Sequence, residues 1–127
     1  MLLLEGDAPM ILVVDDDKVL TQLLRTLLED AGYDVTVVHD GGQAYDYLRK
    51  PECKGMILDI RMPGLNGAEL LMLMAAEEIP VPVIVVAGFP DFDEEEMKEF
   101  PNVKRFFLKP LYPDEVLAAV REIAPLD

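Results

Sequence analysis

Five short runs of apolar or β-branched residues punctuate the chain, at 10–14, 34–38, 56–59, 83–86 and 105–108. The run Met10–Val14 has no polar residue at all, which is the pattern of a strand buried on both faces. The second run is β-branched instead, with valine at 35, 37 and 38. The pattern therefore predicts five strands.

Between these runs, apolar residues recur at helical spacing. We expect a helix between Asp17 and Gly32, a short helix through Ala44, Tyr47 and Leu48, and a helix over 68–78. We also expect a short helix within 91–100 and a last helix that begins at Pro113 and extends to Ile123. Asp17 is a suitable N-cap for the first helix and Gly32 a suitable stop, while Pro113 fits the first turn of the last helix.

Strands that alternate with helices indicate an α/β fold with right-handed crossovers, a doubly wound parallel sheet. We expect the flavodoxin-like strand order 2-1-3-4-5 with helices on both faces. The length of 127 residues fits one domain. We assign residues 10–124 to it, residues 1–9 to a short leader and residues 125–127 to its C-terminal end, with no output domain.

The composition argues against some classes of function. The chain has 25 acidic against 11 basic residues, a formal net charge of -14, which disfavours direct binding to nucleic acid or to anionic membranes. Its single cysteine, Cys53, excludes an internal disulfide and fits a reducing cytoplasm. The first nine residues lack the basic and long apolar regions of a signal peptide.

Charged residues follow three of the predicted strands. Asp15, Asp16 and Asp17 follow the first, Asp59 ends the third, and Lys109 follows the fifth. The carboxyl ends of parallel strands share one edge, and the expected order places strands one and three side by side. Clustered carboxylates suit a hard cation, and Mg2+ also uses phosphate oxygens as ligands. An aspartate can then accept a phosphoryl group as nucleophile, and Asp59 is the best placed candidate.

These motifs resemble the receiver domains of two-component response regulators. The resemblance covers about residues 10–124 and rests on Ile11–Asp17, on Leu58–Gly64 with Gly67, and on Leu108–Pro110. It implies that Asp59 is the phosphoacceptor, that Asp16 and Asp15 bind Mg2+ (or Mn2+) together with Asp59 and the Arg61 carbonyl, and that Lys109 contacts the phosphoryl group. The implied partners are a sensor histidine kinase or a histidine phosphotransfer protein, and a downstream protein effector. By this resemblance the protein is not an enzyme beyond its own phosphorylation and autodephosphorylation, and it is a monomer or weak homodimer.

One position departs from the family pattern. Ala87 stands where receivers usually carry Ser or Thr, so the hydroxyl that couples the phosphoryl group to the aromatic position, here Phe106, is missing. We expect the Gly88 amide to remain available to a phosphoryl oxygen and Phe106, which has no phenol, to pack inward. Losing a charge-assisted hydrogen bond of about 1.5 to 3 kcal/mol would weaken this coupling by roughly tenfold to a hundredfold.

Three further residues with reactive or metal-binding side chains are expected to have structural rather than functional roles. We expect Asp17 to be a helix cap rather than a metal ligand, His39 to be a loop or helix-entry residue, and Cys53 to be an ordinary loop thiol.

Two alternatives remain at this stage. The segment Asp15–Leu20 also fits a haloacid-dehalogenase-like phosphatase, with Asp15 as nucleophile and Asp17 as acid. A degenerate receiver, suggested by Ala87, would act as an interaction module that does not depend on phosphorylation.

Overall fold

The computed structural model describes residues 8–61, 66–88 and 94–126. It contains five parallel strands: β1 (Met10–Val14), β2 (Asp34–Val38), β3 (Cys53–Asp59), β4 (Val83–Ala87) and β5 (Val103–Leu108). The five helices are α1 (Lys18–Asp30), α2 (Gly41–Leu48), α3 (Gly67–Ala76), α4 (Glu94–Met97) and α5 (Pro113–Ile123). Strand order is β2-β1-β3-β4-β5, which confirms the predicted doubly wound, flavodoxin-like sheet.

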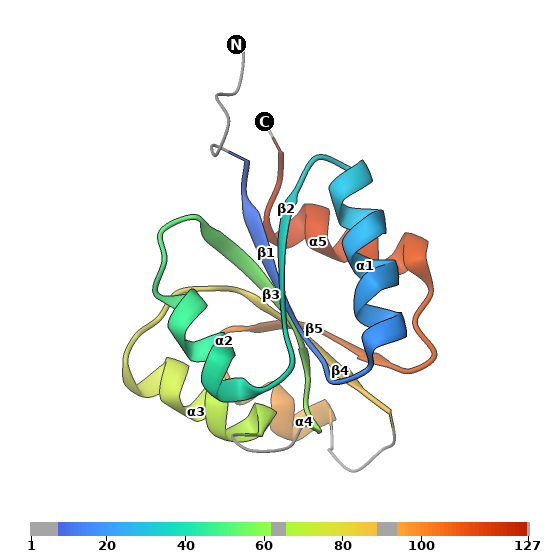
Figure 1. Cartoon of the computed structure of the whole chain (residues 1–127). Helices are drawn as coiled ribbons and strands as arrows, with labels where there is room; N and C mark the ends of the chain where they lie inside the picture. Colours follow the sequence, from blue (N-terminus) through green and yellow to red (C-terminus); the bar gives the residue numbers. More distant parts are fainter. Residues whose placement is uncertain (1–7, 62–65, 89–93, 127) are drawn as a thin grey trace.

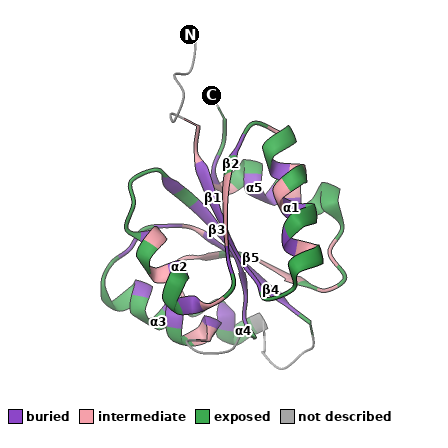
Figure 2. Cartoon of the chain, in the orientation of Figure 1, coloured by how far each residue is buried: buried purple, intermediate pink, exposed green. Residues whose placement is uncertain are grey.

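Helices cover both faces of this sheet (Figure 1). One core cluster joins the sheet to α2, α3 and α4 through residues such as Leu48, Leu70 and Met97. The other joins the opposite face to α1 and α5, through Leu28 and Val120 among others. The central strands are buried along their length while the outer helix surfaces are exposed (Figure 2). This two-sided burial explains why β1 and β4 are continuously apolar.

The predicted caps of α1 are confirmed. The Asp17 side chain accepts hydrogen bonds from the backbone amides of Val19 and Leu20, so it satisfies two of the free donors of the first turn. At the other end Gly32 has a φ of 105°, a left-handed conformation that glycine adopts without steric cost. Asp17 and Gly32 therefore fix the two ends of α1, the helix that follows β1 and its acidic residues.

Several predicted boundaries differ from the structure. Strand β3 begins at Cys53 rather than at 56, and β5 begins at Val103 rather than at 105. Helix α3 ends at Ala76, two residues early, and the described part of the acidic segment forms only the single turn α4. Residues 1–7 of the expected leader and residues 89–93 lie outside the described residues. None of the helices in the described ranges has the length and hydropathy needed to cross a bilayer.

Cys53 was expected in a loop, and that prediction is wrong. The residue opens β3 with 5% of its surface exposed, because its backbone pairs with Met10 of β1. Burial raises the pKa of its thiol to about 11. The three residues Cys53, Lys54 and Gly55 lack the continuous apolar pattern of the rest of the strand, so sequence alone placed the boundary too late.

We expect Cys53 to react slowly with iodoacetamide at pH 8. A thiol with a pKa near 11 is only ~0.1% thiolate at that pH, against about a quarter for an unperturbed cysteine, and the thiolate is the nucleophile. The native protein should therefore alkylate at least ~100-fold more slowly than the same chain in guanidinium chloride, as followed by intact mass. Equal rates in the two conditions would show that the thiol is exposed.

Candidate functional site

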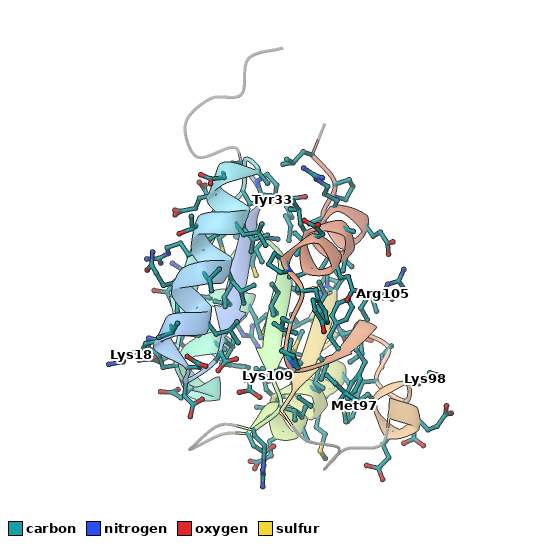
Figure 3. The ribbon with its side chains drawn as sticks, turned by 90° about the vertical axis from the view of Figure 1, so that its right-hand side faces the viewer. Lys18, Tyr33, Met97, Lys98, Arg105 and Lys109 are labelled. Carbon is teal, nitrogen blue, oxygen red and sulfur yellow. The ribbon has the colours of Figure 1, made fainter. Side chains whose placement is uncertain are left out.

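The carboxyl ends of β1, β3 and β5 bring four predicted residues together. Ligand atoms of Asp15, Asp16 and Asp59 all lie within 4.8 Å of one another. The Lys109 ammonium lies 3.1 Å from Oδ2 of Asp15 and 3.3 Å from Oδ2 of Asp59. Figure 3 shows Lys109 at the end of β5, at the opposite end of the sheet from Tyr33. The four side chains that the sequence analysis grouped from their positions at three strand ends therefore lie close together.

Backbone amides orient the two buried carboxylates. Asp15 and Asp59 are each 4% exposed. The Asp17 amide donates to Oδ1 of Asp15 at 2.9 Å, and the Arg61 amide donates to Oδ1 of Asp59 at 3.1 Å. In both cases the donor lies two residues after the acid, where the chain leaves its strand. Each carboxylate thus keeps one oxygen held by its own turn and the other oxygen directed to Lys109.

The charges in the cluster do not balance. Within the described cluster, three carboxylates stand against the single ammonium group of Lys109, a formal excess of two negative charges. Burial, with a smaller contribution from the Asp59 charge, raises the pKa of Asp15 to about 6 even though the Asp17 amide and Lys109 act in the opposite direction. For Lys109, burial lowers the pKa, but the hydrogen bonds and charges of Asp15 and Asp59 outweigh it and the net shift is upward.

This donor set fits a hard divalent cation. All three side chains offer oxygen, two of them are buried and oriented, and the exposed Asp16 opens the cluster to solvent. A cation at this position would compensate the surplus negative charge, and Mg2+ prefers a few carboxylates with open positions for water and phosphate. The fit rests on the cluster's own charge and geometry.

Two further predicted positions, Ala87 and Gly88, also lie at this edge, and Phe106 lies within β5. Ala87 ends β4 with 1% of its surface exposed, and its carbonyl accepts from the Lys109 amide at 2.8 Å. Gly88 follows Ala87 and is exposed. A Cβ added at Gly88 would lie 3.8 Å from the Lys109 side chain. Phe106 is half-buried and packs against the core cluster on the α3 side of the sheet. The structure thus brings the phosphoryl-site candidates together, with Phe106 two strand positions behind Leu108.

One contact was missed by the sequence analysis. The Nδ1 atom of His39, which follows β2, lies 2.9 Å from the carbonyl oxygen of Asp15. Because a carbonyl only accepts, Nδ1 must carry the proton in this contact. His39 therefore helps to hold the backbone of a candidate metal ligand. The signal available in the sequence was its position at the end of a strand next to β1.

The predicted N-cap role of Asp17 also bears on the phosphatase alternative. Its Oδ1 is occupied by two backbone amides of α1, whereas the alternative needs this carboxyl as a proton donor to a leaving group. Asp59, which that alternative leaves without a role, lies instead at the centre of the cluster. The geometry therefore does not support a haloacid-dehalogenase-like site.

Comparisons with known proteins agree with this arrangement. Residues 11–121 match the family model of the response regulator receiver domain. The DNA-binding response regulator MtrA of Mycolicibacterium smegmatis is 32% identical over 111 residues, which cover 87% of this chain and 48% of MtrA. Transcriptional regulatory protein FixJ of Bradyrhizobium diazoefficiens is 35% identical over 121 residues, 91% of this chain and 58% of FixJ. The chain thus spans about half the length of these curated relatives.

Solved structures give the same result. The receiver domain of Francisella response regulator 1452 superposes with a TM-score of 0.81 at 30% identity, covering 91% of this chain and 96% of that one. A response regulator receiver protein from Pseudomonas putida gives a TM-score of 0.81 at 32% identity, and the match covers 91% of this chain and 97% of that one. With the family model matched over most of its length, this chain belongs to the response regulator receiver domain family.

Proposed function

We propose that this receiver accepts a phosphoryl group from a phosphohistidine onto Asp59 and passes the signal on by protein contact. The observation that carries the proposal is the Lys109 ammonium held between the buried carboxylates of Asp15 and Asp59. Phosphoryl transfer depends mainly on positioning and charge stabilisation. A carboxylate at the carboxyl end of a strand, with a cation and further acids beside it, suits this chemistry.

In the proposed step, a carboxylate oxygen of Asp59 forms the new bond to phosphorus while the P–N bond of phosphohistidine breaks. The electron pair of that bond stays on the departing imidazole ring. Lys109 is close enough to Asp59 to pair with the incoming phosphoryl oxygens, and the Arg61 amide keeps the carboxylate oriented. Turnover is limited to this transfer and to later hydrolysis of the acyl phosphate.

Asp16, Asp15, Asp59 and the Arg61 carbonyl would hold Mg2+, with Mn2+ as the alternative ion. The bound ion would supply positive charge to phosphoryl oxygens. The proposed donors are a sensor histidine kinase or a histidine phosphotransfer protein, and the proposed output is a protein effector. The proposed location is the cytoplasm, and the proposed assembly is a monomer or weak homodimer.

Loss of the Asp16 charge should weaken Mg2+ binding by at least about tenfold, because one of three anionic ligands becomes a neutral amide. Isothermal titration of Asp16→Asn against the unmodified protein measures this. Asp17→Asn is the matched control, since asparagine also serves as an N-cap and Asp17 is committed to α1. Equal weakening in both variants would indicate a diffuse charge effect rather than a site.

The test of the proposed function is intact-mass spectrometry after incubation with acetyl phosphate and Mg2+. We expect one phosphate adduct, which disappears when EDTA replaces Mg2+. A protein that binds Mg2+ but gains no adduct from any phosphodonor would contradict the proposal. It would favour the second candidate, a degenerate receiver that acts as an interaction module.

That second candidate is favoured by Ala87, which offers no hydroxyl to an incoming phosphoryl group. Ala87→Thr should strengthen the coupling between phosphorylation and the Phe106 environment by roughly tenfold to a hundredfold, since it restores a charge-assisted hydrogen bond. Proton NMR of the Phe106 ring in the phosphorylated and unphosphorylated proteins measures this coupling. Ala87→Val, similar in shape but without the hydroxyl, should leave it unchanged. A gain in both variants would attribute the effect to side-chain volume.

A further inference from the structure

The end of β2 holds the backbone of Asp15 through two hydrogen bonds. Regular pairing of β1 with β2 ends at Val14 and Val38. One residue further, the Asp15 amide donates to the Val38 carbonyl at 3.3 Å, and Nδ1 of His39 donates to the Asp15 carbonyl at 2.9 Å. The His39 side chain thus continues the link between the two strands into the loop that follows β1.

His39 is itself held by the first turn of α2. Its amide donates to Oε1 of Gln43 at 3.3 Å, and the Gln43 amide donates to the carboxylate of Asp40, the N-cap of α2, at 2.8 Å. The exposed imidazole therefore extends from a backbone position that is fixed on the side of α2. A supporting hydrogen bond from such a position holds its partner in one orientation.

Asp16 is the member of the acidic cluster that depends most on its backbone. The carboxylates of Asp15 and Asp59 each accept from a backbone amide and contact Lys109. Among the residues that the structure describes, no hydrogen bond or ion pair reaches the exposed Asp16 carboxylate. The Asp15 carbonyl and the Asp16 amide belong to one planar peptide group, so a hydrogen bond to that carbonyl restricts the direction in which the Asp16 side chain leaves the chain.

We propose that His39 is a positioning residue for the cation site and that, by holding the Asp15 carbonyl, it directs the Asp16 carboxylate toward Asp15 and Asp59. Ligand atoms of the three acids lie within 4.8 Å of one another although like charges repel, so Asp16 needs a restraint to stay in the cluster. Groups that hydrogen-bond behind metal ligands contribute to metal affinity in this way. The inference rests on the proposed function, since it takes the acidic cluster to be the Mg2+ site.

The experiment is isothermal titration of the full chain with Mg2+. His39→Ala removes the donor and should weaken Mg2+ binding by about fivefold, the effect expected for the loss of one hydrogen bond. His39→Asn should bind Mg2+ to within about twofold of the unmodified protein, because its side-chain nitrogen lies as many bonds from Cα as Nδ1 does and also donates. Rescue by asparagine would assign the effect to the hydrogen bond rather than to the size of the ring.

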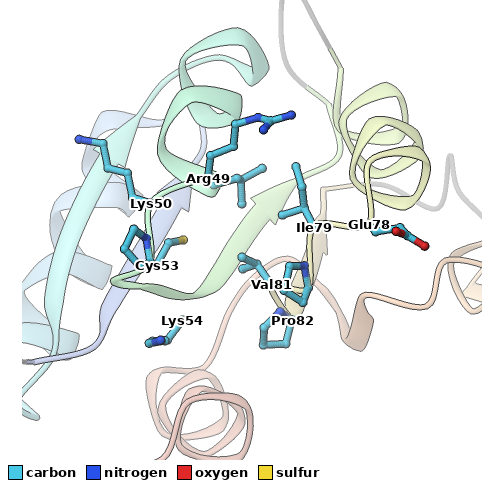
Figure 4. A pocket seen from close by; sticks show the side chains of 11 residues that line it. Arg49, Lys50, Cys53, Lys54, Glu78, Ile79, Val81 and Pro82 are labelled. Carbon is cyan, nitrogen blue, oxygen red and sulfur yellow. The ribbon is translucent and has the colours of Figure 1, made fainter.

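Asn102→Ala controls for a loss of stability alone. The Asn102 side chain donates to the carbonyls of Ile79 and Val81 at 2.7 and 2.9 Å. These two residues line a hollow at the other edge of the sheet, where β3 and β4 begin (Figure 4). Removing the amide should lower the free energy of unfolding in urea and leave Mg2+ affinity unchanged. Equal losses of affinity in Asn102→Ala and His39→Ala would mean that His39 acts only through stability.

Two further readouts test whether His39 acts through Asp16. In an Asp16→Asn background, His39→Ala should weaken Mg2+ binding by less than about twofold, because the carboxylate that it positions is gone. In the metal-free protein, NMR of His39→Ala should show shifted resonances for the Asp15 carbonyl carbon and the Asp16 amide. The amides of residues 79–82, at the other edge of the sheet, should keep their resonances.

Mg2+ affinity in His39→Ala within about twofold of the unmodified value would overturn the inference. It would also be overturned if His39→Asn bound as weakly as His39→Ala, if the full effect persisted in the Asp16→Asn background, or if the unmodified protein bound no Mg2+. The phosphate adduct separates this inference from the proposed function. Weakened Mg2+ binding in His39→Ala, beside an unmodified protein that binds Mg2+ but gains no adduct, would support the inference and contradict the proposed function. An adduct on the unmodified protein with equal Mg2+ binding in His39→Ala would do the reverse.

Discussion

Asp59→Asn is expected to abolish the phosphate adduct completely. The asparagine amide has nearly the same shape as the carboxylate but is not a nucleophile at phosphorus, so positioning by the Arg61 amide cannot compensate for the lost chemistry. The variant should still fold, because the change removes one of the negative charges that crowd the acidic cluster, and Lys109 keeps its contact with Asp15. Intact mass after treatment with acetyl phosphate and Mg2+ measures the effect.

The matched control is Asp17→Asn, which changes an acid two residues from Asp15 but preserves the cap of α1. This control should gain the adduct as fully as the unmodified protein. An adduct that persists in Asp59→Asn would place the phosphoacceptor at another residue. Loss of the adduct in both variants would mean that general negative charge, rather than Asp59, is required.

Gly67→Ala is expected to cause the largest loss of stability among the single methyl additions at the described glycines. A Cβ at position 67 would lie 2.7 Å from the Cα of Ile60 and 3.2 Å from the carbonyl oxygen of Asp59. The backbone cannot move away as a flexible side chain would, so the start of α3 must shift. Overpacking of this kind costs about 1 to 3 kcal/mol or more. Chemical denaturation should show the loss as a lower midpoint with little change in slope.

The control for this prediction is Gly88→Ala, where the added methyl group lies 3.8 Å from the Lys109 side chain, an ordinary contact distance. Its free energy of unfolding should stay within about 0.5 kcal/mol of the unmodified value. If Gly67→Ala lowers the free energy of unfolding as little as Gly88→Ala does, the space between the start of α3 and the end of β3 accommodates a methyl group. If both variants are strongly destabilised, loss of glycine itself, rather than the clash with Ile60, is responsible.

Sequence patterns predicted the sheet because its strands are buried on both faces. Every residue of β1 and β4 is buried, so both strands appear in the sequence as continuous apolar runs, which is the pattern of a strand covered on both faces. The acidic cluster followed from topology, since the carboxyl ends of adjacent parallel strands must meet. Strand-end residues such as Asp15, Asp59 and Lys109 could therefore be grouped before any distance was known.

Other features depend on contacts between residues far apart in the chain. The hydrogen bond of His39 to the Asp15 carbonyl spans 24 residues, and those of Asn102 to Ile79 and Val81 span 23 and 21. Nothing in the local sequence specifies such pairs. The early start of β3 at Cys53 has the same origin, because pairing with β1 overrides a weak local pattern.

The most direct test of the central claim is to locate the acyl phosphate within the chain. Borohydride reduction of the phosphorylated protein converts an aspartyl phosphate to homoserine, and peptide fragmentation then identifies the residue that carried the phosphate. We predict homoserine at position 59 alone. Homoserine at Asp15 or Asp16, or no reduced residue in a protein that has bound Mg2+ and phosphodonor, would contradict the assignment of Asp59 as the phosphoacceptor.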